Sequence, residues 1–119
     1  MTRFDFQHPP FDVLTAGERE TVEAAADIVF HGNDEVLLAP AQPVECLYMV
    51  IKGIVREMAG EEVLALYREH DTFDARALVA GQTQHRFEVD EEALLYSLPK
   101  EVVLHLIESN PVFGAFFFQ

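Results

Sequence analysis

The strongest constraint on the fold is a series of short apolar runs that are separated, at nearly regular intervals, by residues that favour turns. Gly32-Asn33-Asp34 and Lys52-Gly53 are two of these separators, and Ala59-Gly60 would form the turn of a hairpin. Turn residues that recur at this rhythm indicate a β-sandwich or a β-barrel. The predicted strands cover residues 28–30, 36–38, 47–51, 54–55, 63–67, 85–90 and 93–98.

Helical patterns precede and follow the predicted strands. Thr15 and Glu18 have the spacing of a capping box, in which each side chain accepts a hydrogen bond from the other residue's backbone N–H. We therefore expect a helix over residues 16–26. Pro99 suits the first position of another helix, because its missing N–H would have no partner there. Asn110-Pro111 should stop or kink that helix, so the closing helices are expected within residues 99–119.

The C-terminal sequence VFGAFFFQ is rich in aromatic residues. An exposed stripe of this kind would be costly in water. We expect at least half of the four rings to pack on the domain's own barrel. The alternative is an assembly module, in which the rings form a homodimer surface or dock on the C-terminal domains of a longer protein. The rings belong to Phe113, Phe116, Phe117 and Phe118.

Length and charge narrow the class of protein. A chain of 119 residues suggests one domain, over residues 1–119. The formal net charge of -13 argues against nucleic acid as a partner, because proteins meet phosphates with clustered Lys and Arg. Cys46 is the single cysteine, expected as a buried structural thiol, and the lack of a disulfide pair favours a cytoplasmic location. No apolar run approaches the ~20 residues that span a membrane, so no membrane partner is expected.

Motifs of catalysis and of metal binding are missing from the sequence. The five histidines show neither H-x-H nor H-x-x-x-H spacing, so their spacing predicts no metal site. A P-loop, a nucleophile elbow and a dinucleotide-binding glycine pattern are also lacking. The acidic clusters 61–62 and 90–92 fall at predicted turns, where solvated side chains are the rule. We therefore predict no catalytic residues, no cofactor and no enzyme activity.

The order of these elements resembles the cyclic nucleotide-binding domain family. EVLLAPAQPVECLYMVIKGIV is similar to that family's central hairpin, and VLALYREHDTFDARAL is similar to its L-x-x-G-D-x-F-G-E-x-A-L stretch. EEALLYSLPKEVVLHLIESNPVF resembles its final strand and helix. The resemblance covers about residues 11–117. It implies a mainly β fold with flanking helices, namely an eight-stranded β-roll or jelly roll over 11–98 and closing helices over 99–119. Asp34 and Ala41 replace two of the family's turn glycines, while Gly53 remains.

Residues 73–87 correspond, by this resemblance, to the phosphate-binding cassette. There the backbone N–H groups of a short helix face a cyclic phosphate. The resemblance also implies a glutamate that accepts a hydrogen bond from the ribose 2′-hydroxyl, and about ten residues later an arginine that pairs with the phosphate. The ligand-binding positions assigned in this way are Phe73, Asp74, Ala75, Arg76, Ala77, Thr83, Gln84 and His85.

The chain departs from the family pattern at the residues that would form hydrogen bonds or ion pairs with the cyclic nucleotide. Asp74 stands where the family has glycine, and it adds negative charge near the expected phosphate. Ala75 holds the glutamate position and cannot accept a hydrogen bond from ribose. The scaffold remains, with Phe73 as an anchor, a short helix at Ala77-Leu78 and a loop at Gly81.

The arginine position falls within residues 83–86, where strand alternation decides which side chains face inward. If Phe87 points into the barrel, Thr83 and His85 point inward as well. Arg86 and Gln84 then point outward. We therefore expect Thr83 or His85 to hold the arginine's place, although a β-bulge would reverse this assignment.

The leading functional prediction is a regulatory sensor domain of a bacterial signal-transduction protein, with a degenerate cassette and weak or no cAMP or cGMP binding. Its effector would be another small molecule, a small anionic ligand included. One alternative is a genuine cyclic nucleotide-binding domain, and another is an assembly module without a ligand. The stretch FDARAL…HRF further resembles the N-terminal domain of bacterial proteins with a CBS pair and a nucleotidyltransferase-like region. This likeness implies a domain excised from a longer protein.

Overall fold

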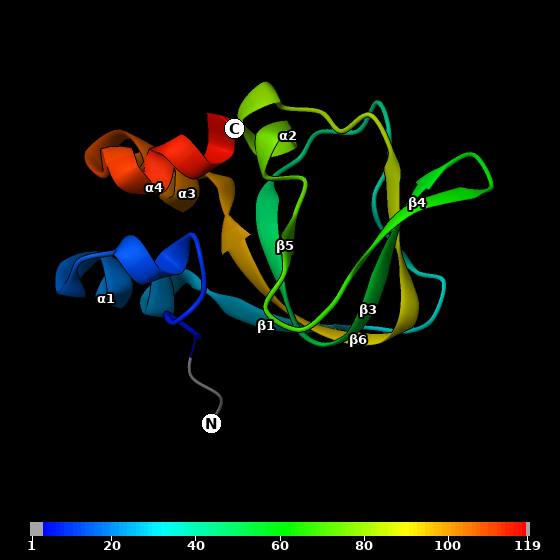
Figure 1. Cartoon of the computed structure of the whole chain (residues 1–119), viewed down its shortest axis with the longest axis horizontal. Helices are drawn as coiled ribbons and strands as arrows, with labels where there is room; N and C mark the ends of the chain where they lie inside the picture. The colour runs from blue at the N-terminus through cyan, green and yellow to red at the C-terminus, as the bar shows by residue number, and fades with distance from the viewer. Residues whose placement is uncertain (1–3, 119) are drawn as a thin grey trace.

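The computed structural model describes residues 4–118, so the outermost parts of the predicted domain, residues 1–3 and 119, lie outside the described residues. One antiparallel sheet of six strands wraps into a roll (Figure 1). Four strands follow one another in the order β1-β6-β3-β4, while β2 pairs with β6 and β5 pairs with β3. The strands are β1 (Asp27–His31), β2 (Val36–Leu38), β3 (Cys46–Ala59), β4 (Glu62–Tyr67), β5 (Thr72–Phe73) and β6 (Arg86–Pro99).

The roll has six strands, whereas the resemblance implies eight and the sequence pattern placed seven. Two pairs of the seven predicted strands are each continuous, and β5 was not among the predicted ranges. Residues 47–51 and 54–55 belong to the 14-residue β3, and residues 85–90 and 93–98 fall almost entirely in the 14-residue β6. The two long strands stay paired across several shifts in register around Gly53. A Cβ atom at Gly53 would meet the backbone oxygen of Glu92 and lie 2.8 Å from the Cα of Ala93. Glycine lets β3 bend there without leaving the sheet.

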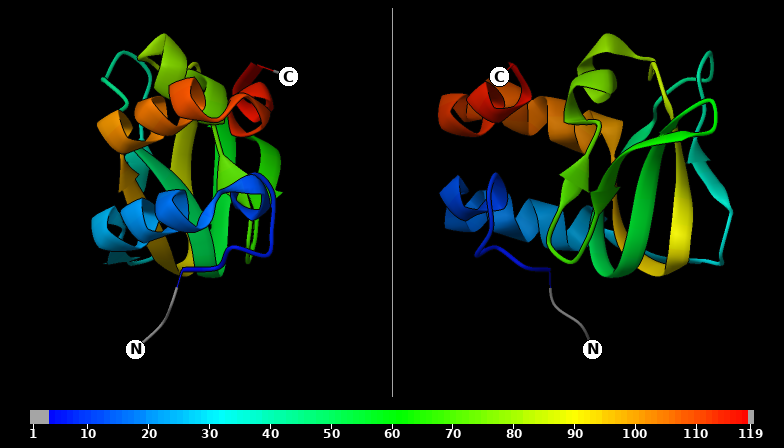
Figure 2. Two further views of the ribbon diagram at one scale, coloured as in Figure 1. Left: turned by 90° about the vertical axis from the view of Figure 1, so that its left-hand side faces the viewer. Right: turned by 45° about the vertical axis from the view of Figure 1, so that its right-hand side comes forward.

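The N-terminal and C-terminal helices lie together at one end of the roll, whereas the short helix of residues 75–80 lies against the roll itself (Figure 2). The predicted capping box is confirmed, since the Thr15 N–H donates to Glu18 Oε1 at 2.8 Å and the Glu18 N–H donates to Thr15 Oγ1 at 3.3 Å. Asn110 caps α4 and also donates from Nδ2 to Glu18 Oε1 at 2.9 Å, which joins the starts of two helices. The helical elements are η1 (Phe11–Val13), α1 (Ala16–Ala25), α2 (Ala75–Ala80), α3 (Lys100–Ser109), α4 (Pro111–Ala115) and η2 (Phe116–Phe118).

The C-terminal phenylalanines mostly pack within the domain, as predicted. Phe113 and Phe117 are fully buried and Phe116 is half-buried, whereas Phe118 is 64% exposed. The Phe113 ring contacts that of Phe11, with centroids 5.7 Å apart, so the two ends of the chain share one core. None of the helices within residues 4–118 is both long and apolar enough to cross a membrane.

Several turns hold non-glycine residues in the left-handed backbone region. Asp34 has φ 68° and Ala41 has φ 69°, at the two positions where the resemblance expects glycine. His70 (φ 74°) and Asp74 (φ 54°) share this conformation. Side chains with a Cβ adopt it at a cost, which glycine avoids. The family-like turns are therefore kept although their usual residues are gone. Cys46 is free and half-buried, not fully buried as predicted.

Candidate ligand-binding site

The cassette joins β5 to β6 and forms a short helix beside the mouth of the roll (Figure 1). Phe73 anchors its start, since this ring is buried and stacks on Phe87 with centroids 5.2 Å apart. Asp74 turns the chain into α2, and Gly81 (φ 94°) ends that helix. The predicted scaffold of Phe73, short helix and Gly81 loop is therefore present. Ala77 and Leu78 bury the inner face of α2.

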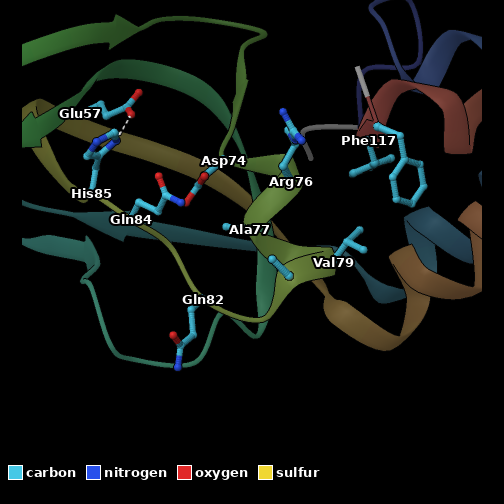
Figure 3. Close-up of a pocket in the computed structure, with 11 residues that line it drawn as sticks. Glu57, Asp74, Arg76, Ala77, Val79, Gln82, Gln84, His85 and Phe117 are labelled. Carbon is cyan, nitrogen blue, oxygen red and sulfur yellow. Dashed lines mark hydrogen bonds and ion pairs between the residues drawn. The ribbon is translucent and has the colours of Figure 1, made fainter.

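A cavity of about 680 Å³ lies between the cassette, β3 and the C-terminal η2. Figure 3 shows Glu57 and His85 joined at one end of it, with Arg76, Val79 and Phe117 at the other. An adjoining hollow of about 330 Å³ shares some of these residues and reaches Phe73 and Ala75. The polar side chains that line the larger cavity are Glu57, Asp74, Arg76, Gln82, Gln84 and His85.

The structure brings together seven of the eight predicted positions. Phe73 and Ala75 line the smaller hollow, Asp74, Arg76 and Ala77 line one or both cavities, and Gln84 and His85 line the larger one. Thr83 lines neither. Its side chain is buried, its hydroxyl donates to the backbone oxygen of His85 at 3.1 Å, and it accepts from the His85 N–H at 3.3 Å.

The resemblance assigned Gln84 to the ligand-binding positions, whereas strand alternation predicted that its side chain points out of the barrel; the structure places Gln84 in the cavity lining. The prediction extended the alternation of β6 back to residue 83, but β6 begins at Arg86. The paired hydrogen bonds between Thr83 and His85 form a local turn, in which side chains do not alternate as they do in a strand. Gln84 is therefore free to line the cavity.

Arg86 faces away from the cavity, as predicted. Its Nε donates to Glu88 Oε2 at 2.9 Å, and its terminal nitrogen donates to the Gly60 backbone oxygen at 3.1 Å. Glu88 also accepts from Arg56 Nε at 2.8 Å, and Arg56 pairs with Asp34 as well at 2.6 Å. This network of charges occupies Arg86 outside the cavity, so it is not available to a ligand there.

Asp74 places a poorly solvated carboxylate in the cavity. Its Oδ2 atom is buried and has no hydrogen-bond partner within residues 4–118. Burial raises the pKa of Asp74, because it penalises the charged form, and the negative charge of Glu57 raises it further. Thr83 and His85 act in the opposite direction but do not cancel these effects.

Glu57 is the functional candidate that sequence reasoning missed. Its Oε2 lies 2.6 Å from His85 Nδ1, and its Oε1 accepts the Tyr67 hydroxyl at 2.7 Å. Burial and the bond to Glu57 raise the pKa of the Tyr67 hydroxyl, so it stays a donor. Glu57 sits in the hairpin VREMAGEEV, where acidic residues are ordinary, and only the pairing of β3 with β6 brings it to the cassette.

The site therefore combines two carboxylates with two basic side chains, of which one is already bound within the protein and the other can contact a ligand. His85 occupies the expected arginine region, but its Nδ1 is already bound to Glu57. Arg76 is exposed and makes no ion pair or hydrogen bond with the residues that the structure describes. Such an arrangement suits a ligand that offers hydrogen-bond donors to Asp74 and Glu57, with a polar or anionic group near Arg76.

Comparisons with known proteins support the fold and its family. Solved structures that resemble the chain include the sensor domain of the transcriptional regulator DNR from Pseudomonas aeruginosa, at 17% identity and TM-score 0.80, covering 91% of this chain and 80% of that one. The C-linker/CNBHD of zELK channels, crystallized in the presence of cAMP, matches at 17% identity and TM-score 0.79, over 94% of this chain and 59% of that one. The regulatory domain of Toxoplasma gondii PKA with cAMP matches at 21% identity and TM-score 0.73, over 80% and 38%.

These identities show a common fold and no more, and a search of curated proteins found no match. Family membership is shown by the sequence itself. A family model of the cyclic nucleotide-binding domain matches residues 28–110, which is more than half of the chain. That match spans the roll, the cassette and α3, whereas η2, which also lines the cavity, lies outside it. The chain belongs to the cyclic nucleotide-binding domain family.

Proposed function

We propose that the chain is a regulatory, non-catalytic sensor domain of a bacterial signal-transduction protein, and that it binds cAMP and cGMP weakly or not at all. The carboxylates of Asp74 and Glu57 in the cassette cavity are the observation that carries this proposal. The sequence likeness to N-terminal domains with a CBS pair and a nucleotidyltransferase-like region supports C-terminal partner domains in a longer chain.

Electrostatics and hydrogen bonding both disfavour a cyclic phosphate in this cavity. A carboxylate about 4 Å from a phosphate charge opposes it by roughly 4 kcal/mol at an effective dielectric constant of 20. Ala75 offers no acceptor to a ribose hydroxyl, and a hydrogen bond to a charged group is worth about 1.5–3 kcal/mol. Arg86, bound to Glu88 outside the cavity, cannot offset these losses.

The expected effector is a small molecule with hydrogen-bond donors or positive charge. Asp74 Oδ2 has no hydrogen-bond partner among the residues that the structure describes, so a donor placed against it would satisfy a group that is otherwise costly to bury. Arg76 can receive a carboxylate or phosphate group of the same molecule at the other end of the cavity. A zwitterionic ligand would match both ends.

Arg76 also supports the second candidate, a genuine cyclic nucleotide-binding domain. Arg76 lies on the cassette helix itself, has no ion-pair partner within residues 4–118, and borders both cavities. A cyclic phosphate held by Arg76 would lie near the outer end of the cavity, away from Glu57. Arg76→Ala would then abolish cyclic nucleotide binding, whereas our leading proposal predicts no binding to abolish.

Thermal shift and calorimetry with cAMP and cGMP test the leading proposal. A ligand at a hundredfold its Kd would stabilise the domain by roughly 2.7 kcal/mol, and we expect no saturable shift up to millimolar nucleotide. The restoring variant Glu57→Gln/Asp74→Gly/Ala75→Glu/His85→Arg should gain binding, and Ala75→Glu alone serves as the control. Saturable binding of either nucleotide to the unmodified chain at micromolar concentration would overturn the proposal.

The assembly alternative rests on the apolar residues that stay exposed near the C-terminus. Val112 is 66% exposed and Phe118 is 64% exposed. In a longer protein, these side chains would contact the domain that follows. Sedimentation of the fragment separates this from self-association, because a strict monomer at high concentration is inconsistent with a homodimer but compatible with contacts to a following domain.

A further inference from the structure

Two histidines and an aspartate from distant parts of the chain meet outside the cassette. Asp5 and His8 lie in the segment that precedes η1, and His70 lies in the turn between β4 and β5. Asp5 Oδ2 is 2.6 Å from His8 Nδ1 and 2.7 Å from His70 Nδ1. Donor atoms from all three residues lie within 4.8 Å of one another. We propose that Asp5, His8 and His70 form a binding site for Zn²⁺ or a similar divalent transition metal.

The ligand types and their orientation fit such an ion. Two imidazole nitrogens and a carboxylate oxygen are common zinc ligands. Asp5 Oδ1 accepts the Gln7 N–H at 2.8 Å, and this bond turns Oδ2 toward the two rings. The side chains of His8 and His70 are about 40% exposed, so an ion can reach them from solvent.

An outer carboxylate supports one of the metal ligands. Glu69 Oε1 lies 3.5 Å from His70 Nε2, the ring nitrogen on the side away from Asp5. Metal-bound histidines usually donate their other ring N–H to a carboxylate or carbonyl, which fixes the tautomer and the ring orientation. Glu69 is placed to accept this hydrogen bond once His70 Nδ1 binds the metal.

The backbone of His70 gives an independent reason to assign it a role. His70 lies in the turn that joins β4 to β5, and its φ of 74° is in the left-handed region. Glycine adopts this conformation without strain, but the position holds a histidine. Such outliers cost free energy, and they often mark functional positions. The His70 N–H donates to the Val50 backbone oxygen at 2.8 Å, which holds the turn against β3.

Metal binding requires a small and defined rearrangement. The centroids of the two rings are 3.9 Å apart with an interplanar angle of 8°, so the lone pairs of the ring nitrogens lie in nearly parallel planes. Ligands of a tetrahedral zinc ion lie roughly 3.3 Å apart, since each Zn–N bond is about 2.0 Å. The rings must therefore tilt and move away from Asp5 Oδ2 by several tenths of an ångström. Each neutral ring keeps its proton, on Nε2 instead of Nδ1, and a neighbouring cavity of about 440 Å³ leaves room for a water as fourth ligand.

The site would tie the N-terminal segment to the roll. That segment leads into η1, where Phe11 packs against Phe113 of the C-terminal helices. A bound ion would therefore stabilise the docking of the helical group, and this role is independent of what occupies the cassette cavity. Spacing rules missed the site because His70 is far from Asp5 and His8 in the sequence.

Calorimetric titration of Zn²⁺ into chelator-treated, dialysed protein tests the proposal. We expect one ion per chain, and visible absorption of tetrahedral cobalt when Co²⁺ replaces it. His8→Ala and His70→Asn should each weaken Zn²⁺ binding at least a hundredfold. Asparagine is chosen at His70 because it tolerates the left-handed backbone. Glu69→Gln, which keeps all three ligands, should weaken binding about 10–100-fold.

His31→Ala is the matched control, because His31 Nδ1 also lies 2.6 Å from a carboxylate, that of Glu35, but without a third ligand among the described residues. This variant should bind Zn²⁺ as the unmodified chain does. The proposal would be overturned if His31→Ala and His70→Asn lost Zn²⁺ affinity equally, or if the unmodified protein bound Zn²⁺ only at millimolar concentration. The three side chains would then serve only as hydrogen-bond partners of one another. Zn²⁺ at a hundredfold its Kd should also raise Tm by roughly 10 °C, and His8→Ala should lose this shift.

Discussion

Asp74→Gly is the substitution that most directly tests how the cassette departs from its family. Asp74 carries two costs, a left-handed backbone with φ 54° and a half-buried carboxylate whose Oδ2 has no partner among residues 4–118. Aspartate tolerates this backbone better than most residues, so the first cost is about 0.5–1 kcal/mol. The second is about 1 kcal/mol, at the low end for an unsatisfied buried group, because the side chain is only half-buried.

Glycine removes both costs but makes the unfolded chain more flexible. That flexibility opposes folding by about 0.5–1 kcal/mol. The net expectation is a gain of about 1 kcal/mol in the free energy of unfolding at neutral pH, or roughly 3–5 °C in Tm. Asp74→Asn is the matched control, since it keeps the left-handed tolerance and the shape of the side chain while removing only the charge.

The pH dependence of this gain has a definite sign. Burial raises the pKa of Asp74 in the folded state above its ordinary value. The fold therefore favours the protonated side chain, and its stabilising contribution is complete below the unfolded pKa and lost as pH rises through the folded pKa. The advantage of Asp74→Gly and of Asp74→Asn over the unmodified chain should be largest at neutral pH and shrink in acid.

Urea denaturation across this pH range measures the effect, provided that the slope of unfolding free energy against urea is the same in all three proteins. A glycine variant that is less stable than the unmodified chain at neutral pH would refute the reasoning on the backbone. An asparagine variant whose advantage does not change with pH would refute the reasoning on the charge.

Five further substitutions test the supporting structure, each by its effect on unfolding free energy. Gly53→Ala should destabilise by more than about 3 kcal/mol, because the new Cβ would strike the backbone of β6 at a φ of 95°; a loss under 1 kcal/mol would contradict the bend assigned to this glycine. Ala41→Gly should stabilise by about 0.5–1 kcal/mol by relieving a φ of 69°, and a loss would show the turn to be unstrained. Arg56→Met should cost about 3 kcal/mol, since it leaves a buried glutamate with fewer partners, and high salt should not reproduce that loss. Phe117→Ala should cost about 3–5 kcal/mol because the ring is fully buried, whereas Phe118→Ala, at 64% exposure, should cost under about 1 kcal/mol.

Local signals in the sequence predicted the elements of the fold well. The Thr15–Glu18 box fixed the start of α1, and Asn110-Pro111 fixed the end of α3. The number of strands was less predictable, because Lys52-Gly53 reads as a turn in the sequence but forms a bend within β3. A glycine is typical both of a turn between two strands and of a bend within one strand. Only the pairing of β3 with β6 distinguishes these two structures.

The candidate site was predictable only where neighbours in sequence determine it. Phe73, Asp74 and the α2 helix follow one another along the chain, so the resemblance placed the short helix where the structure has α2. The direction of Arg86 followed from strand alternation, whereas Gln84 lies in a turn where alternation fails. Glu57 reaches His85 through tertiary pairing, which a single sequence does not encode in any local pattern.

The position of the cavity suits the proposed function of a regulatory domain with a changed cassette. The walls come from two groups of elements, with Glu57 and His85 on the roll, and Phe117 on η2, which packs beside α2. A ligand can shift a conformational equilibrium only by binding one arrangement more tightly than another. A ligand in this cavity would contact both groups at once, so any change in how they pack would alter its affinity. Under the proposed function, that coupling would depend on the walls and not on a phosphate, so it would not require the residues that contact a cyclic nucleotide in the family.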